Sequence, residues 1–200
     1  MKIQTQLKLV TGAVIAVTAI STANAAQETV NASVQVNNTI TMTVNSALDF
    51  GTIAAFANSN TTADLATLVI PADPAGAIVD DQVGTARIIS LAAGAPADVS
   101  VSGAAANYAL TVAVTAASSA LDDPAGIAPD GFTMGSFTTY AYLEGNGQTF
   151  GTTTDATGAL GLNIGATLST VTPAGGAAAD ASVAYTDATY TGVLEVDINY

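Results

Sequence analysis

The sequence contains no cysteine, no histidine and no tryptophan, and only three of its 200 residues are Lys or Arg. Without Cys and His, the chain has no thiol nucleophile, no imidazole base and neither of the usual soft metal ligands. Without disulfides, the fold must depend on strand pairing and on a core of Ala, Val, Leu and Ile with a few Tyr and Phe. These missing residue types argue that the protein is not an enzyme.

The first 25 residues have the pattern of a cleavable signal peptide. Lys2 and Lys8 give a basic start, and the apolar run Leu9–Ile20 is too short to span a membrane, which argues against the alternative of a membrane anchor. Ala23-Asn24-Ala25 fits the small-x-small cleavage pattern. We therefore expect residues 26–200 to form one exported domain with no integral membrane segment. It would be located in the periplasm, on the outer surface or outside the cell.

The chain is strongly acidic. Removal of the signal peptide leaves Arg87 as the single cation against 16 Asp and Glu, a formal charge of −15. Such a surface repels nucleic acid and anionic lipid, which proteins bind mainly through Lys and Arg. Arg87 is the only side-chain cation that could bind a phosphate or a carboxylate, although pairing with one nearby acid is the simpler interpretation.

The hydrophobic pattern after residue 25 is that of short β-strands. Leu194, Val196, Ile198 and Tyr200 alternate with polar residues, which predicts a half-buried strand with these four side chains facing inward. Similar patterns predict further strands at Val30–Val44, Ala47–Ile53, Leu65–Ile70, Ala86–Ala92, Val99–Ser102, Tyr108–Thr115, Phe132–Leu143, Leu160–Val171 and Val183–Tyr185. Within Ala47–Ile53, Gly51 is well placed for a bend or a bulge. Asn146-Gly147 gives a hairpin signal, and Asp73-Pro74-Ala75-Gly76 a turn. The pattern predicts an all-β sandwich of about nine or ten short strands.

Four motifs carry a family resemblance: Leu48-Asp49-Phe50-Gly51, Val99-x-Val101-x-Gly103, Ile164-Gly165-Ala166-Thr167-Leu168 and Tyr190-x-Gly192…Val196-x-Ile198-x-Tyr200. In their order along the chain they resemble the exported bacterial domain of unknown function 4402. That family is similar to spore coat protein U and to the pilins of archaic chaperone–usher systems. The resemblance implies an immunoglobulin-like, pilin-like sandwich in a secreted structural or surface protein, and it brings no catalytic residues.

Val30–Val44 is a strand-forming stretch without charge, Gly or Pro, so none of the usual devices would protect it as an exposed edge. We expect it to be paired, and two partners are open. It can pair within its own chain as the first strand of the sandwich. Alternatively, its first part, with Val30, Val34 and Val36, can insert into the next subunit, as the resemblance to pilins implies. Asn37-Asn38 would then be the hinge between the donated and the retained strands.

Two non-catalytic binding sites are alternatives. Asp122, Asp123 and Asp130 lie in a turn-rich stretch and are weak candidates for calcium ligands, since hard cations prefer several oxygen ligands. Neither this stretch nor the one with Asp73, Asp80 and Asp81 matches a known calcium loop, and Asp also simply favours turns. Tyr140, Tyr142 and Phe150 could form a stacking surface for sugars, but in a chain without tryptophan packing in the core or across strands is the simpler explanation.

The sequence thus predicts a secreted or cell-surface structural protein, a fimbria-type or coat subunit that assembles by β-strand pairing. Its expected partners are copies of itself or a periplasmic chaperone. The alternative is a secreted non-catalytic binding module for glycan or calcium, and a hydrolase is a third class that nothing in the sequence singles out.

Overall fold

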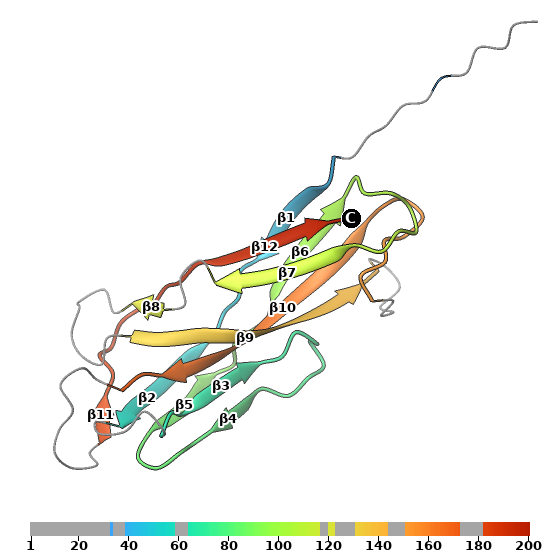
Figure 1. Ribbon diagram of the computed structural model, residues 1–200. Helices are drawn as coiled ribbons and strands as arrows, with labels where there is room; N and C mark the ends of the chain where they lie inside the picture. The colour runs from blue at the N-terminus through green and yellow to red at the C-terminus, as the bar shows by residue number, and fades with distance from the viewer. Residues whose placement is uncertain are drawn as a thin grey trace, which may run out of the picture. The chain divides into compact units, whose positions relative to one another are not determined.

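The computed structural model describes Ser33 and residues 39–58, 64–116, 120–122, 131–143, 151–172 and 182–200. The chain divides between Asn37 and Asn38, and all the strands below belong to the unit Asn38–Tyr200. Over the described residues the protein is all-β, with antiparallel strand pairing and no helix (Figure 1). This part of the chain accordingly contains no helix with the length and apolar character needed to cross a membrane.

The described residues form twelve strands. They are β1 Thr41–Ser46, β2 Thr52–Asn58, β3 Thr67–Ile70, β4 Val79–Asp81, β5 Arg87–Ala92, β6 Ala97–Ser102, β7 Thr111–Ala116, β8 Ala120–Asp122, β9 Gly131–Tyr142, β10 Leu160–Thr170, β11 Ser182–Ala184 and β12 Leu194–Asn199. Ten of these lie at or within a few residues of the strands that the hydrophobic pattern predicts. The pattern missed two short strands, β4 and β8, because runs of three residues carry too little periodicity to detect.

The long strand β10 is the centre of the largest sheet. One of its edges pairs with β9 along most of its length, while the other pairs first with β6 and then with β3. β1 continues this sheet beyond β6, β4 continues it beyond β3, and β8 pairs with β9. β10 is buried almost throughout, which explains its near-continuous run of small and apolar residues.

Two smaller sheets, β11-β2-β5 and β12-β7, complete the fold. A first core packs the sheet of β2 and β5 against β3, β9 and β10; its largest members are Phe50, Leu68, Ile70, Ile88, Phe132, Met134 and Leu168. A second core packs the β7–β12 pair against β6 and β10; its largest members are Val99, Val101, Leu110, Leu160, Leu162 and Ile164. The two small sheets therefore cover different parts of the central strand β10.

Two of the expected local features are confirmed. The Asp73 carbonyl accepts a hydrogen bond from the Gly76 N–H at 2.8 Å, which closes the Asp-Pro-Ala-Gly turn. Gly51 adopts a φ of +80° where the chain bends into β2, as a glycine between two strand patterns suggests. The expected hairpin turn at Asn146-Gly147 lies outside the described residues.

Candidate functional site

β1 carries an apolar face that is left uncovered. Met42 and Val44 lie opposite Val101 and Val99 of β6 in the antiparallel ladder. Opposite residues of such a ladder project from the same face of the sheet, and Val99 and Val101 are buried in the second core. Met42 and Val44 nevertheless remain 42% and 62% exposed. The inner face of the sheet thus continues onto β1, but the described residues cover it only in part there.

β12 presents a second incomplete edge. All six of its residues pair with β7, and among the described residues it has no other strand partner. Its apolar side chains, Leu194, Val196 and Ile198, are half-buried against the second core, whereas Glu195 and Asp197 are exposed. Among the described residues, the other edge of β12 therefore has no strand partner and lies beside an apolar face, which is the usual template for an added strand.

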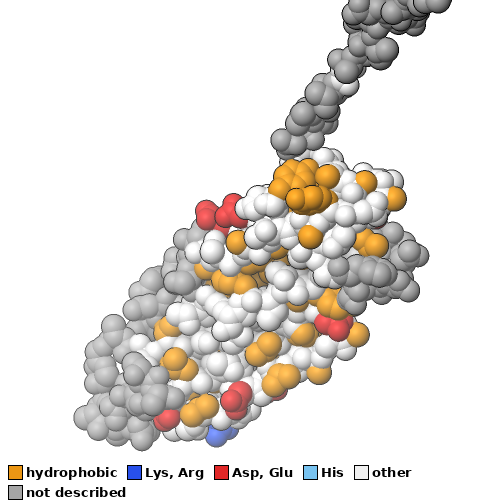
Figure 2. Space-filling model, turned by 45° about the vertical axis from the view of Figure 1, so that its right-hand side comes forward, with side chains coloured by type: hydrophobic (Ala, Val, Ile, Leu, Met, Phe, Trp, Pro, Cys, Tyr) orange, Lys and Arg blue, Asp and Glu red, His pale blue; other side chains and the backbone are white. Residues whose placement is uncertain are grey.

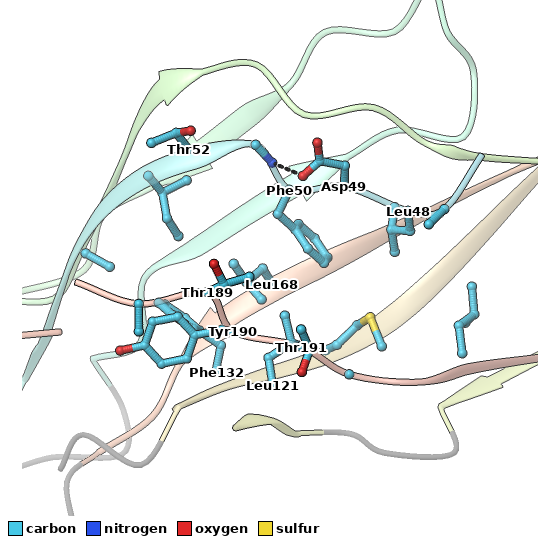
Figure 3. Close-up of a pocket in the computed structure, with 18 of the residues that line it drawn as sticks. Leu48, Asp49, Phe50, Thr52, Leu121, Phe132, Leu168, Thr189, Tyr190 and Thr191 are labelled. Atoms are coloured by element: carbon cyan, nitrogen blue, oxygen red, sulfur yellow. Dashed lines mark hydrogen bonds between the residues drawn. The ribbon is translucent and has the colours of Figure 1, made fainter. Parts of the chain in front are cut away.

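A groove of about 1020 Å³ lies between these incomplete elements. One wall runs from Val44 at the end of β1 to Phe56 in β2, and the other is the segment Ala184–Val196. Core side chains form the floor, and Figure 3 shows Leu168 between the two walls. This volume is at the upper end of the range for small-molecule pockets, about 300–1,000 Å³, and most of the lining is apolar.

The first wall is held by a bend at Leu48-Asp49-Phe50-Gly51. The backbone groups of Asp49 and Ala95 exchange two hydrogen bonds, at 3.0 and 2.8 Å. The Asp49 side chain also accepts a hydrogen bond from the Gly51 N–H at 2.8 Å (Figure 3). A Cβ at Gly51 would lie within 2.2 Å of the Ala92 carbonyl oxygen, so this approach requires glycine. The bend turns Phe50 into the first core, where it is 9% exposed.

Three aromatic side chains close one end of the groove. Phe132 and Tyr185 stack with ring centroids 4.1 Å apart, and Tyr190 meets Phe132 edge-to-face at 5.0 Å. The Tyr185 hydroxyl accepts a hydrogen bond from the Val171 N–H at 2.9 Å, and burial raises the pKa of Tyr185 to about 12. The Tyr190 hydroxyl donates to the Thr186 carbonyl at 3.0 Å. These contacts fix the segment that leads into β12.

The structure brings only some of the predicted strand-pairing residues together. Leu194 and Val196 line the groove, and Ile198 packs on the second core. Val30, Val34 and Val36 lie outside the described residues.

Tyr200 does not face inward as predicted, because it is 44% exposed beyond the end of β12. Its ring meets the exposed Tyr108 edge-to-face at 5.5 Å, and its hydroxyl accepts a hydrogen bond from the Ala105 N–H at 3.0 Å. The Tyr200 ring therefore packs against the loop that carries Ala105 and Tyr108, and it does not occupy a position in the core.

Sequence reasoning missed the groove itself. Phe50, Phe132 and the pair Tyr185 and Tyr190 come from three separate stretches, and only the pairing of the strands brings them together. Two sequence features could have pointed to the groove, the Leu48–Gly51 motif and the Tyr190-x-Gly192 pattern. Each of them lies in one of the two walls.

The binding-site alternatives receive no support from the described residues. Asp122 ends β8, its side chain is not described, and Asp123 and Asp130 lie outside the described residues. Within the described part of the chain, no three acidic side chains gather in a way that could hold a metal ion.

The proposed sugar-stacking surface is described only in part, since Phe150 lies outside the described residues. Tyr142 covers Gly161 of the neighbouring strand, where an added Cβ would lie 2.3 Å from its ring. Its hydroxyl donates to Asp98 at 2.6 Å. Tyr142 therefore has a cross-strand packing role.

Comparison with protein-family models, with curated proteins and with solved structures found no match to this chain.

Proposed function

We propose that the protein is an exported, non-catalytic structural subunit with an incomplete immunoglobulin-like sandwich. It would assemble with copies of itself when a strand of one copy fills the groove of the next. The observation that carries this proposal is the groove between β1 and β12, whose lining is mostly apolar and whose bordering strands each have, among the described residues, one edge without a strand partner. The resemblance to pilin-like domains supports the same assignment.

The proposed occupant is Val30–Val36 of a second copy. In this stretch Val30, Ala32, Val34 and Val36 alternate with Asn31, Ser33 and Gln35. An extended segment of this length places all its apolar side chains on one face and its backbone groups in the plane of the sheet. It would span about 23 Å, close to the about 20 Å of the six-residue β12. The apolar face would cover the groove while the backbone pairs with β12.

The groove would also have to be protected from non-specific pairing before assembly. An apolar groove with two open strand edges promotes non-specific pairing. A periplasmic chaperone that occupies the groove would prevent this, and it is the second partner that we propose. The same chain could instead insert its own Val30–Val36 into its own groove, in which case the protein would be a monomer.

Deletion of residues 26–36 distinguishes donation from self-insertion. Under donation, the shortened chain folds when a peptide of residues 26–38 is supplied, but it forms no polymers, whereas the parent chain forms ladders on gels that heat dissolves. A peptide that carries Val34→Asp is the matched control, because a charge on the inserted face should abolish the rescue. A parent chain that stays monomeric by light scattering, with a melting temperature independent of concentration, would overturn the proposal.

A further inference from the structure

One end of the domain carries an exposed aromatic pair. Tyr108 and Tyr200 are 52% and 44% exposed, and their rings meet edge-to-face at 5.5 Å. Ala105 and Ala106, in the same loop as Tyr108, are exposed as well. Figure 2 shows hydrophobic side chains, in orange, gathered at the end of the molecule where β1 begins in Figure 1. Aromatic residues are enriched where proteins bind one another, so these four residues, the end patch, suit a protein partner.

Hydrogen bonds hold the end patch in place. The buried Thr154 hydroxyl accepts a hydrogen bond from the Tyr108 N–H at 3.0 Å and donates one to the Ala105 carbonyl at 2.6 Å. The Thr154 N–H in turn donates to the Tyr108 carbonyl at 3.0 Å. On the other side, the Ala105 N–H donates to the Tyr200 hydroxyl at 3.0 Å. Because these contacts order the loop before any partner arrives, binding to it loses little conformational entropy.

The end patch also lies in an uncharged part of the sequence. Residues 99–121 contain no Asp, Glu, Lys or Arg, whereas residues 26–200 carry a formal charge of −15. Asp155 contacts the loop only through its backbone carbonyl, which accepts a hydrogen bond from the Asn107 N–H at 2.9 Å. Its carboxylate instead accepts hydrogen bonds within its own turn. A second acidic copy therefore meets fewer charged side chains at this patch than elsewhere on the chain.

The chain enters the domain beside the end patch. Gly103 has a φ of +77°, and a Cβ at this position would lie 2.4 Å from the Thr39 carbonyl oxygen. Thr39, two residues before β1, thus packs directly on Gly103. Only two residues separate Gly103 from Ala105, whose N–H binds the Tyr200 hydroxyl. The start of the domain and its exposed aromatic pair therefore share one end.

The short connection to the donated segment decides what this end meets. Only Asn37 and Asn38 separate Thr39 from Val36, the last residue of the segment Val30–Val36. Three Cα–Cα steps of about 3.8 Å reach at most about 11 Å. When Val36 lies in the groove of a second copy, the Thr39 end of the donor must therefore lie within about 11 Å of that groove.

We propose that the end patch of the donor docks on the copy that receives its strand, beside the groove. This inference rests on the proposed strand donation and adds a second contact to it. The strand fills the groove, while the patch fixes the angle between successive copies. A connection of two residues cannot fix this angle alone, because its backbone dihedrals rotate freely unless other contacts hold them.

A displacement assay separates the end patch from the groove. The chain that lacks residues 26–36 is loaded with a fluorescent peptide of residues 26–38, and unlabelled competitors release the label. The peptide carries the strand without the domain, so it measures the groove alone. The competitor of residues 26–200 is used below the concentration at which it polymerises. It should release the label at a concentration at least about tenfold lower than the unlabelled peptide, because it adds the patch. Equal potency would overturn the proposal.

Tyr108→Ser tests the patch itself. In the competitor, this substitution should reduce the potency to nearly that of the peptide. In the receiving chain it should change nothing, because only the patch of the donor lies at the joint. Val79→Ser in the competitor is the matched control, since Val79 is 53% exposed but lies on β4, outside the patch and the groove. Equal effects of Tyr108→Ser in both chains, or no effect in the competitor, would overturn the proposal.

A cross-link measures proximity without removing a tyrosine. Ala106→Cys gives residues 26–200 their single thiol, to which a benzophenone is attached. Illumination of the polymers should join neighbouring copies through this position. The same label on Ala75→Cys, in the exposed turn between β3 and β4, should not join them. Polymers without the Ala106 cross-link would refute the docking of the patch alone. Failure of the fluorescent peptide to bind the shortened chain would instead refute strand donation, on which the docking rests.

Discussion

Two glycines on the paired strands β9 and β10 differ in how closely neighbouring atoms surround them. A Cβ at Gly165 of β10 would lie 2.2 Å from the Ile70 carbonyl oxygen and 2.4 Å from the Ala72 nitrogen. A Cβ at Gly135 of β9 would meet nothing within 4 Å. Backbone atoms cannot move aside as a flexible side chain can, so only the first glycine is required by its surroundings.

We therefore expect Gly165→Ala to destabilise the protein by about 2 kcal/mol or more, because the end of β3 must move away from β10. Gly135→Ala is the matched control and should change the free energy of unfolding by less than about 0.5 kcal/mol. Urea unfolding of both variants measures the difference. Equal stability of the two variants would mean that β3 does not approach β10 as closely as the structure shows.

Tyr185 gives a prediction that depends on pH. Burial raises its pKa from 10.0 to about 12, so in the folded protein the neutral phenol is favoured. The stability that this provides is fully present below pH 10, the pKa of the unfolded chain, and is lost as the pH rises toward 12. Tyr185→Phe keeps the stacking on Phe132 but leaves the Val171 N–H without its acceptor, which should cost about 1–2 kcal/mol at neutral pH.

The test is urea unfolding of both proteins at several values of pH. The gap in free energy of unfolding between the parent and Tyr185→Phe should shrink between pH 10 and 12, because only the parent must bury or ionise this phenol. Parallel curves over that range would show that Tyr185 is exposed and that the aromatic end of the groove is open.

At the scale of elements, β12 shows which features of a strand the hydrophobic pattern predicts and which it does not. The alternation of Leu194, Val196 and Ile198 correctly predicted one half-buried face and its polar opposite. It failed at Tyr200, since periodicity gives the direction of a side chain but not the position at which the covering layer ends. Similarly, Met42 and Val44 alternate with polar residues in β1 and share a face, but the alternation gives no sign that this face is exposed.

Removal of residues 197–200 tests the contribution of β12. The deletion removes three of its six pairs with β7, those of Asp197, Ile198 and Asn199. Because Ile198 is half-buried and Tyr200 is 44% exposed, the loss should be about 2–4 kcal/mol, at the lower end of the values for fully buried side chains. The urea midpoint of the truncated chain should fall accordingly.

Tyr200→Ala is the control for this deletion. It removes only the exposed ring and its hydrogen bond to Ala105, so the loss should stay near 1 kcal/mol. If Tyr200→Ala alone matched the full deletion, the contact with the Tyr108 loop, and not the pairing with β7, would hold β12 in place.

At the scale of the whole molecule, sequence predicted the class of fold but not the arrangement that creates the groove. Short strands, turn residues and the absence of helical periodicity were enough for an all-β domain. The division of β10 between β6 and β3 along one edge, with two small sheets covering its two halves, follows from long-range pairing that no local pattern encodes. β1 and β12 border one groove although about 150 residues separate them, so the site could not be located before the topology was known.

The charge of the whole molecule predicts how assembly should respond to salt. Residues 26–200 carry a formal charge of −15, so two copies repel each other before the proposed strand insertion. Strand insertion itself depends on apolar burial and backbone hydrogen bonds, which salt screens little. The Debye length falls from about 30 Å at 0.01 M salt to about 8 Å at 0.15 M, so assembly of the chain should accelerate over this range.

Light scattering of the chain without its first 25 residues, in increasing sodium chloride, measures the rate. Glu195→Gln combined with Asp197→Asn removes two exposed charges from β12 without touching its apolar face. This variant should assemble faster than the parent at low salt and should show a smaller acceleration as salt increases. Assembly that slows as salt rises would mean that attraction between opposite charges drives it. Arg87 is the only side-chain cation in residues 26–200, so slowing would point to Arg87 and not to the groove.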